Sequence, residues 1–226
     1  MNNFFLTIVF VFSSIAMNAQ QPDISKLPLS IIKPKKQIAD LPLVIYISGD
    51  GGKNTFSTDI VNRFALHGYP VVILNTLKYF WKKKDPAQAA ADLEKIISVY
   101  RKEWNGRKIC LVGYSMGADV LPFMYTRLSA QTQALVSNVV FISPSNNTDF
   151  EVHLSSLFAN DRGQSVPAEI SKILRQVIIV QGIDEKEKME TTLLDKNRYL
   201  LLMLKGGHHY NADPDMVVNK ILENLK

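Results

Sequence analysis

The stretch Ile109-Cys110-Leu111-Val112-Gly113-Tyr114-Ser115-Met116-Gly117-Ala118-Asp119 decides the fold of this chain. Its first four residues are apolar and favour β structure, and the segment 118–128 that follows is helix-like. Between them lies a G-x-S-x-G pattern, which is typical of a serine held on a sharp strand-to-helix turn. Glycines on both sides of such a serine remove side chains that would collide with neighbouring elements. The stretch therefore predicts a nucleophile elbow centred on Ser115.

The rest of the chain alternates between buried-strand and helix patterns. Continuous apolar runs, typical of strands covered on both faces, predict strands at 41–48, 71–74, 139–143, 177–181 and 199–204, with a first strand at 28–32. Helical spacing predicts helices over 56–65, 86–104 and 214–225, the last two each preceded by an Asp-Pro cap, and a short helix over 187–195. The alternation predicts an α/β-hydrolase fold, a mostly parallel sheet with helices on both faces.

A serine nucleophile needs a base to remove its proton and an acid to orient that base. In this fold the acid comes after the serine in the chain, and the histidine base comes last. The acid is predicted after the strand 177–181, where Glu185 is preferred over Asp184, and Asp149 is a third choice. The base is predicted in the tandem pair after the last strand, where His209 is preferred over His208. The sequence thus predicts a Ser115–His209–Glu185 triad with named alternatives.

Two backbone positions are candidates for the oxyanion hole. The N–H of Met116 follows the serine at a helix N-terminus, and the glycine-rich loop 49–52 follows an early strand, so its donor is assigned to the N–H of Asp50. No G-K-[ST] follows that loop, which excludes a phosphate-binding P-loop. Neither a metal nor another cofactor is expected, because no His, Asp, Glu or Cys cluster has ligand spacing.

Length and composition indicate one exported domain. The chain has 226 residues, of which 46% are hydrophobic, with a net charge of +5 and a single cysteine, Cys110. Its first 20 residues resemble a secretory signal peptide and predict a periplasmic location, which leaves 21–226 as one monomeric domain. The irregular segment 144–175 is interpreted as a cap over the site. The lysine-rich segments 33–36 and 81–84 suit an anionic membrane surface, and no motif indicates nucleic-acid binding.

Five segments together resemble the VirJ/AcvB family of periplasmic virulence-associated proteins. They are Ser48-Gly49-Asp50-Gly51-Gly52, Leu77-Lys78-Tyr79-Phe80-Trp81, the block from Gly113 to Phe123, Asp149-Phe150-Glu151 and Gly206-Gly207-His208-His209. The chain resembles the short, one-domain VirJ form, although Lys53 stands where the family pattern has an aromatic residue. The resemblance implies an exported serine hydrolase with Ser115 as nucleophile. It links AcvB-like members to hydrolysis of lysyl-phosphatidylglycerol and VirJ-like members to type IV secretion.

The best substrate hypothesis is therefore an aminoacyl-phospholipid. Its ammonium groups need carboxylates near the serine, and Asp119, Asp50, Asp149 and Glu151 are the candidates. Gly51 allows close approach of the substrate, and Tyr79 and Trp81 are predicted substrate or membrane-interface contacts. The alternatives are a generic carboxylesterase or thioesterase, and a non-catalytic adaptor for secretion components.

Overall fold

The structure is a computed structural model that describes residues 22–52, 55–152 and 163–225. Its centre is a seven-stranded sheet in the order β1-β3-β2-β4-β5-β8-β9. All of its neighbouring strands are parallel except β1, which pairs antiparallel with β3. The sheet strands are β1 (Leu29–Ile32), β2 (Leu43–Ile47), β3 (Val71–Leu74), β4 (Ile109–Tyr114), β5 (Val136–Ile142), β8 (Val177–Gly182) and β9 (Tyr199–Leu204).

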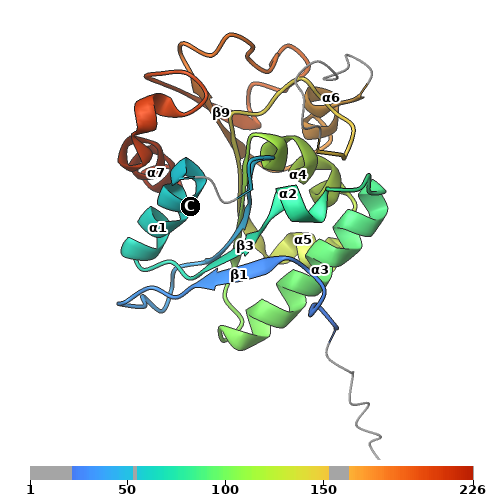
Figure 1. Cartoon of the computed structure of the whole chain (residues 1–226), viewed down its shortest axis with the longest axis vertical. Helices are drawn as coiled ribbons and strands as arrows, with labels where there is room; N and C mark the ends of the chain where they lie inside the picture. The colour runs from blue at the N-terminus through green and yellow to red at the C-terminus, as the bar shows by residue number, and fades with distance from the viewer. Residues whose placement is uncertain (1–21, 53–54, 153–162, 226) are drawn as a thin grey trace, which may run out of the picture.

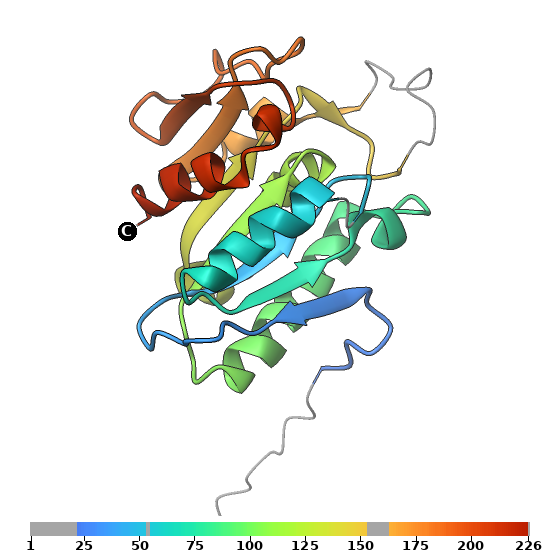
Figure 2. The same ribbon diagram turned by 60° about the vertical axis from the view of Figure 1, so that its left-hand side comes forward.

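Helices cover both faces of the sheet. Figure 1 shows α1 (Thr55–Leu66) and α7 (Pro214–Leu222) on one side, with α3 (Pro86–Glu103), α4 (Met116–Thr126) and α5 (Ala130–Leu135) on the other. Figure 2 shows α1 and α7 lying in front of the strands, with α3 behind them. The structure also contains α2 (Thr76–Tyr79), α6 (Val166–Ile170), the 3-10 helix η2 (Tyr210–Ala212) and a small two-stranded sheet of β6 (Asn147–Thr148) and β7 (Gln164–Ser165).

The apolar runs of the central strands face two separate cores. On β2, Leu43, Ile45 and Ile47 pack with α3 and α4, whereas Val44 and Tyr46 pack with α1 and α7. Side chains of a strand alternate between faces, so a strand covered on both sides must be apolar throughout. This confirms the predicted α/β-hydrolase fold, a mostly parallel sheet between two layers of helices.

Most predicted elements agree with the structure, although α2 and α5 were not predicted. Asp85 and Asp213 cap α3 and α7 by accepting backbone N–H groups of the first turn, as the Asp-Pro pairs predict. The helix predicted over 187–195 is wrong, because these residues form an irregular segment with one short turn. The predicted signal peptide lies outside the described residues, and the segment 144–175 contains β6, β7 and α6, with 153–162 outside the description.

The topology brings the candidate functional residues together at the carboxyl ends of the central strands. The chain runs from β2 outward to β3 and then returns to place β4 on the other side of β2, so the strand order reverses between β2 and β4. Ligands in open α/β sheets bind at the carboxyl ends of the strands, at such a reversal. The loop 49–52 follows β2 and Ser115 follows β4, so both lie at this point.

Candidate active site

Ser115 stands on a strained turn between β4 and α4. Its backbone has φ 52° and ψ −125°, a left-handed conformation that side chains rarely adopt. A side chain at Gly117 would overlap the carbonyl oxygens of Ile47 and Ser48, and one at Gly113 would overlap the backbone of Gly117 and Ala118. The two glycines therefore let α4 pack tightly against the sheet while the serine projects from the turn, as a nucleophile elbow requires.

His208, rather than His209, faces the serine. The His208 Nε2 atom lies 2.9 Å from the Ser115 Oγ. The ring of His209 instead packs edge-on against Phe56 of α1, with ring centroids 5.8 Å apart. The preference for His209 in the sequence is thus corrected to its alternative. The physical reason is the turn after β9, which directs His208 toward Ser115 at the carboxyl end of β4 and His209 toward α1.

Glu185 completes the arrangement on the other side of the imidazole. Its Oε1 atom lies 2.8 Å from His208 Nδ1, and its Oε2 atom accepts the Gly182 N–H at 3.0 Å. Burial raises the pKa of Glu185, but hydrogen bonds from His208, Ser143 and Gly182 outweigh it and hold this pKa below its usual range. Glu185 is therefore an ionised, nearly buried carboxylate against the ring that faces Ser115.

The two other candidate acids lie on loops with different hydrogen-bond partners. Asp184 is exposed, and its backbone N–H donates to the Gly206 carbonyl. Asp149 accepts the N–H of Glu151 at 3.3 Å in the loop after β6. The structure thus places Glu185, the first choice among the three carboxylates, in hydrogen-bond contact with His208.

Two tyrosines, which have no role in the sequence prediction, hold in place the loop after β9 that carries His208. The Tyr114 hydroxyl donates to the carbonyl of His208 at 3.2 Å. The buried Tyr210 hydroxyl lies 2.6 Å from Ser143 Oγ and donates to the Val180 carbonyl at 3.1 Å. These bonds tie the loop after β9 to β4, β5 and β8. An aromatic residue directly after the two histidines was the only signal of this support in the sequence.

The oxyanion side of the site contains the two predicted backbone elements. Met116 is the first residue of α4, so its N–H has no acceptor within the helix. Gly49 lies against the serine, because a Cβ built on it would be 3.3 Å from Ser115 Cβ. The turn continues through Asp50, whose carboxylate accepts the Gly51 N–H at 2.9 Å, and closes with a Gly52 N–H to Gly49 carbonyl bond. Both elements therefore lie beside Ser115.

Asp119 lies one turn after the serine, but it is not presented to a ligand. It is only 8% exposed, and its Oδ1 accepts the N–H of Ser145 at 2.6 Å. Burial raises its pKa to about 7, against the opposing hydrogen bonds from Ser145. The predicted ammonium contact is corrected: the carboxylate connects α4 to the loop after β5, because that backbone N–H occupies it.

The predicted aromatic contacts separate into one buried and one exposed residue. Tyr79 is 5% exposed and donates its hydroxyl to Asp92 Oδ2 at 2.8 Å, so the predicted substrate or membrane contact is wrong for this residue. Its ring is covered by the core, and its one polar atom is satisfied there. Trp81 is 54% exposed, beside the lysines 82–84, and Gly51 is exposed on the loop next to the serine.

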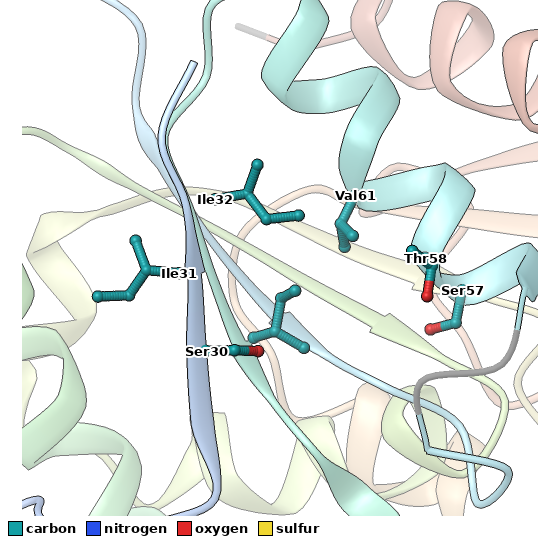
Figure 3. Close-up of a pocket in the computed structure, with 7 residues that line it drawn as sticks. Ser30, Ile31, Ile32, Ser57, Thr58 and Val61 are labelled. Carbon is teal, nitrogen blue, oxygen red and sulfur yellow. The ribbon is translucent and has the colours of Figure 1, made fainter. Parts of the chain in front are cut away.

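A small hollow near β1 is separate from these residues. Figure 3 shows it between β1 and α1, with Ser30, Ser57 and Thr58 supplying its hydroxyl groups. Its volume is about 80 Å³, and none of Ser115, His208 and Glu185 lines it. Over the described ranges, no group of three or more His, Cys, Asp or Glu side chains could hold a metal ion. In the same part of the chain, no helix is long and apolar enough to cross a membrane.

The fold and this arrangement define the class. Solved structures with this fold include Est1E from Butyrivibrio proteoclasticus, with a TM-score of 0.64 and 14% identity over 89% of this chain and 94% of that one. They also include XC6422 from Xanthomonas campestris, described as an α/β serine hydrolase without a lid, with a TM-score of 0.57 and 16% identity over 86% of each chain. The chain has the α/β-hydrolase fold, with a serine, histidine and glutamate in hydrogen-bond contact at its strand ends.

Sequence comparison then gives the family. The chain belongs to the family described as bacterial virulence protein (VirJ), whose model matches residues 41–226. That match includes the whole of the sheet from β2 to β9 and every residue of the site described above. A search of curated protein sequences finds no match.

Proposed function

We propose that this protein is a serine hydrolase that cleaves an ester bond through Ser115, His208 and Glu185. One observation carries the proposal, the continuous line of contacts from Glu185 Oε1 to His208 Nδ1 at 2.8 Å and from His208 Nε2 to Ser115 Oγ at 2.9 Å. This is the spacing that a nucleophile, a general base and an orienting carboxylate need. The esterases and serine hydrolases among the similar structures support the same reaction class.

The reaction follows from the positions of these groups. His208 Nε2 removes the hydroxyl proton as Ser115 Oγ attacks the ester carbonyl, while the ionised Glu185 holds Nδ1–H and stabilises the imidazolium. The N–H of Met116 and an N–H of the loop 49–52, assigned to Asp50, stabilise the oxyanion. The imidazolium returns its proton to the departing alcohol, and the acyl group remains on Ser115. Water activated by His208 then releases the acid and restores the serine.

For the substrate, we propose an aminoacyl-phospholipid such as lysyl-phosphatidylglycerol, met outside the cytoplasm. The sequence resemblance suggests this class because it links AcvB-like members to hydrolysis of lysyl-phosphatidylglycerol, and the exposed carboxylate of Asp50 on the loop beside the serine is consistent with it. An ammonium group on the acyl part would offset this negative charge next to the oxyanion. Exposed Trp81 with Lys82 and Lys83 suits an anionic membrane surface. Other carboxylic esters or thioesters, and an adaptor role toward type IV secretion substrates, are the competing outcomes.

Mass spectrometry of lysyl-phosphatidylglycerol vesicles tests the proposal. The purified protein should release lysine and phosphatidylglycerol, Ser115→Ala should not, and Ser171→Ala is the matched control because Ser171 is exposed at the end of α6. If no lipid is cleaved, a fluorophosphonate probe decides what remains. Labelling that depends on Ser115 would keep the hydrolase and reject the lipid. An absence of labelling in a folded protein would reject the hydrolase in favour of the adaptor.

A further inference from the structure

A polar groove lies beside the acid of the site and is not used in the mechanism above. Its volume is about 720 Å³, and three separate segments line it, at 145–147, at 165–167 and at 186–193. The first follows β5, the second joins β7 to α6, and the third follows Glu185. Most of the lining side chains are hydroxyl, amide or charged groups, with Pro167 and Leu193 as the apolar exceptions. A groove with this lining suits a hydrophilic ligand.

One residue, Asn146, ties the three walls together. Its side-chain oxygen accepts the Glu190 N–H at 2.8 Å, and its side-chain nitrogen donates to the Lys188 carbonyl at 3.3 Å. Its backbone carbonyl accepts the Val166 N–H at 2.9 Å. The spacing between the walls is therefore set by hydrogen bonds, so the groove exists before any ligand binds. A preformed site loses less entropy on binding.

The groove is also joined to the catalytic arrangement at two points. Ser145, in the first wall, donates its N–H to Asp119, which lies one turn after Ser115 on α4. Lys188, in the third wall, donates its ammonium to the backbone carbonyl of Glu185 at 2.8 Å. The groove thus begins next to the acid of the site, where a substrate longer than its ester group has to extend.

The charges of the groove are not neutralised within it. Lys186 and Lys188 bring two ammonium groups, and Glu187 and Glu190 bring two carboxylates. In the described parts of the chain, none of these four side chains forms an ion pair with another charged side chain. Oppositely charged neighbours that do not pair with each other leave both signs available to a ligand.

We propose that this groove binds a zwitterionic, hydrophilic part of the substrate, with Lys186 meeting its anionic group and Glu190 meeting its ammonium group. The proposal rests on the proposed ester hydrolysis only for the statement that the ligand is part of a substrate. The shared chemistry, an oxyanion and an amine a few bonds apart, is found in phosphodiester headgroups and in short peptides. The groove itself favours neither source, so the test has to distinguish them.

Isothermal titration calorimetry of the whole protein tests the groove. The probes are sn-glycero-3-phosphoethanolamine and the dipeptide alanyl-alanine, with glycerol 3-phosphate and ethanolamine as single-charge comparisons. None contains an ester of a carboxylic acid, so binding is measured without turnover. A zwitterion should bind more tightly than either single-charge probe, and Lys186→Ala and Glu190→Ala should each weaken it about 2- to 5-fold, the range of one solvated ion pair. Lys196→Ala and Glu103→Ala, exposed and outside the groove, are the controls.

The outcomes separate this inference from the proposed function. Preference for one zwitterion, lost in both groove variants, supports the site and identifies the source of the ligand chemistry. Failure of both zwitterions to bind, or equal binding by groove and control variants, overturns it. Hydrolysis of the neutral ester p-nitrophenyl acetate is measured on the same samples. If that activity is absent while the groove binds its probe, the serine hydrolase proposal fails and the binding site remains.

Discussion

The Nε2 atom of His208 lies 2.9 Å from the Oγ atom of Ser115, although another histidine follows directly in the chain. His209 turns away and packs its ring against Phe56 and against Tyr114, with the Tyr114 centroid 6.4 Å distant. The two neighbours therefore have different environments, one facing the nucleophile and one forming part of an aromatic cluster. Substitutions of the two histidines should consequently have different effects on catalysis.

His208→Ala should lower the kcat for a soluble ester by roughly 10³- to 10⁶-fold, because the serine loses the group that removes its proton. His209→Ala removes only ring packing and should change kcat less than about 10-fold. Steady-state hydrolysis of p-nitrophenyl acetate measures both, with circular dichroism to check folding. Equal losses in the two variants would show that the histidines act together or that the second is the base.

Glu185→Gln should reduce kcat by roughly 10²- to 10⁴-fold without unfolding the protein, since the amide keeps the shape but cannot stabilise the imidazolium. Hydrogen bonds to the Glu185 carboxylate hold its pKa below the usual range of a glutamate, so the group is ionised at neutral pH. Protonation of Glu185 should therefore not limit kcat/KM in the wild-type protein near neutral pH. Steady-state hydrolysis of p-nitrophenyl acetate near neutral pH measures the loss in Glu185→Gln, with circular dichroism to check folding. Full kcat in Glu185→Gln would mean that the carboxylate does not act on the ring of His208.

Gly117→Ala should destabilise the fold itself. The added methyl group would overlap the backbone carbonyl oxygens of Ile47 and Ser48 at the end of β2, and backbone atoms cannot rotate away as a side chain can. A loss of about 1–3 kcal/mol in the free energy of unfolding is expected from urea titration. Gly207→Ala is the matched control, because its Cβ would lie 3.7 Å from the nearest atom, the Asp184 carbonyl oxygen. Similar losses in both variants would remove the steric explanation of the elbow.

Much of the fold follows from local patterns that physics makes unambiguous. A strand covered on both faces, such as β2, is apolar at every position. Aspartate is a preferred helix cap and proline a preferred first helical residue, so the Asp-Pro pair marks the start of α3. The order of serine, acid and histidine along the chain follows from the order of the strands. Ser115 and Glu185 were predicted for these reasons, and the structure brings them to the same imidazole.

The remaining features depend on contacts between distant segments. No periodicity distinguishes His208 from His209, because the turn after β9 is irregular. Its direction is set by two hydrogen bonds, from the Tyr114 hydroxyl to the His208 carbonyl and from the Tyr210 hydroxyl to the Val180 carbonyl. The segment 187–195 has residues that favour helix, yet its backbone is held by the side chain of Asn146, more than forty positions earlier. The role of Asp119 could not be predicted for the same reason, since its hydrogen-bond partner Ser145 follows a different strand, β5.

Asp119 should make the stability of this protein depend on pH in a direction opposite to most carboxylates. Burial raises its pKa to about 7, so the folded chain binds a proton here more readily than the unfolded chain. Its contribution therefore favours folding below the unfolded value near 4, declines as pH rises, and is at its least favourable above about 7.

Asp119→Asn keeps an oxygen to accept the Ser145 N–H but cannot ionise. It should be more stable than the wild type at pH 8, by an amount on the order of 4 kcal/mol, and the difference should shrink toward pH 4. Urea titrations of both proteins across this range measure it, with Asp119→Ala, which loses the bond to Ser145, less stable than Asp119→Asn throughout. A constant difference between wild type and Asp119→Asn at every pH would show that the carboxyl does not titrate in this window, and would leave the hydrogen bond as its only role.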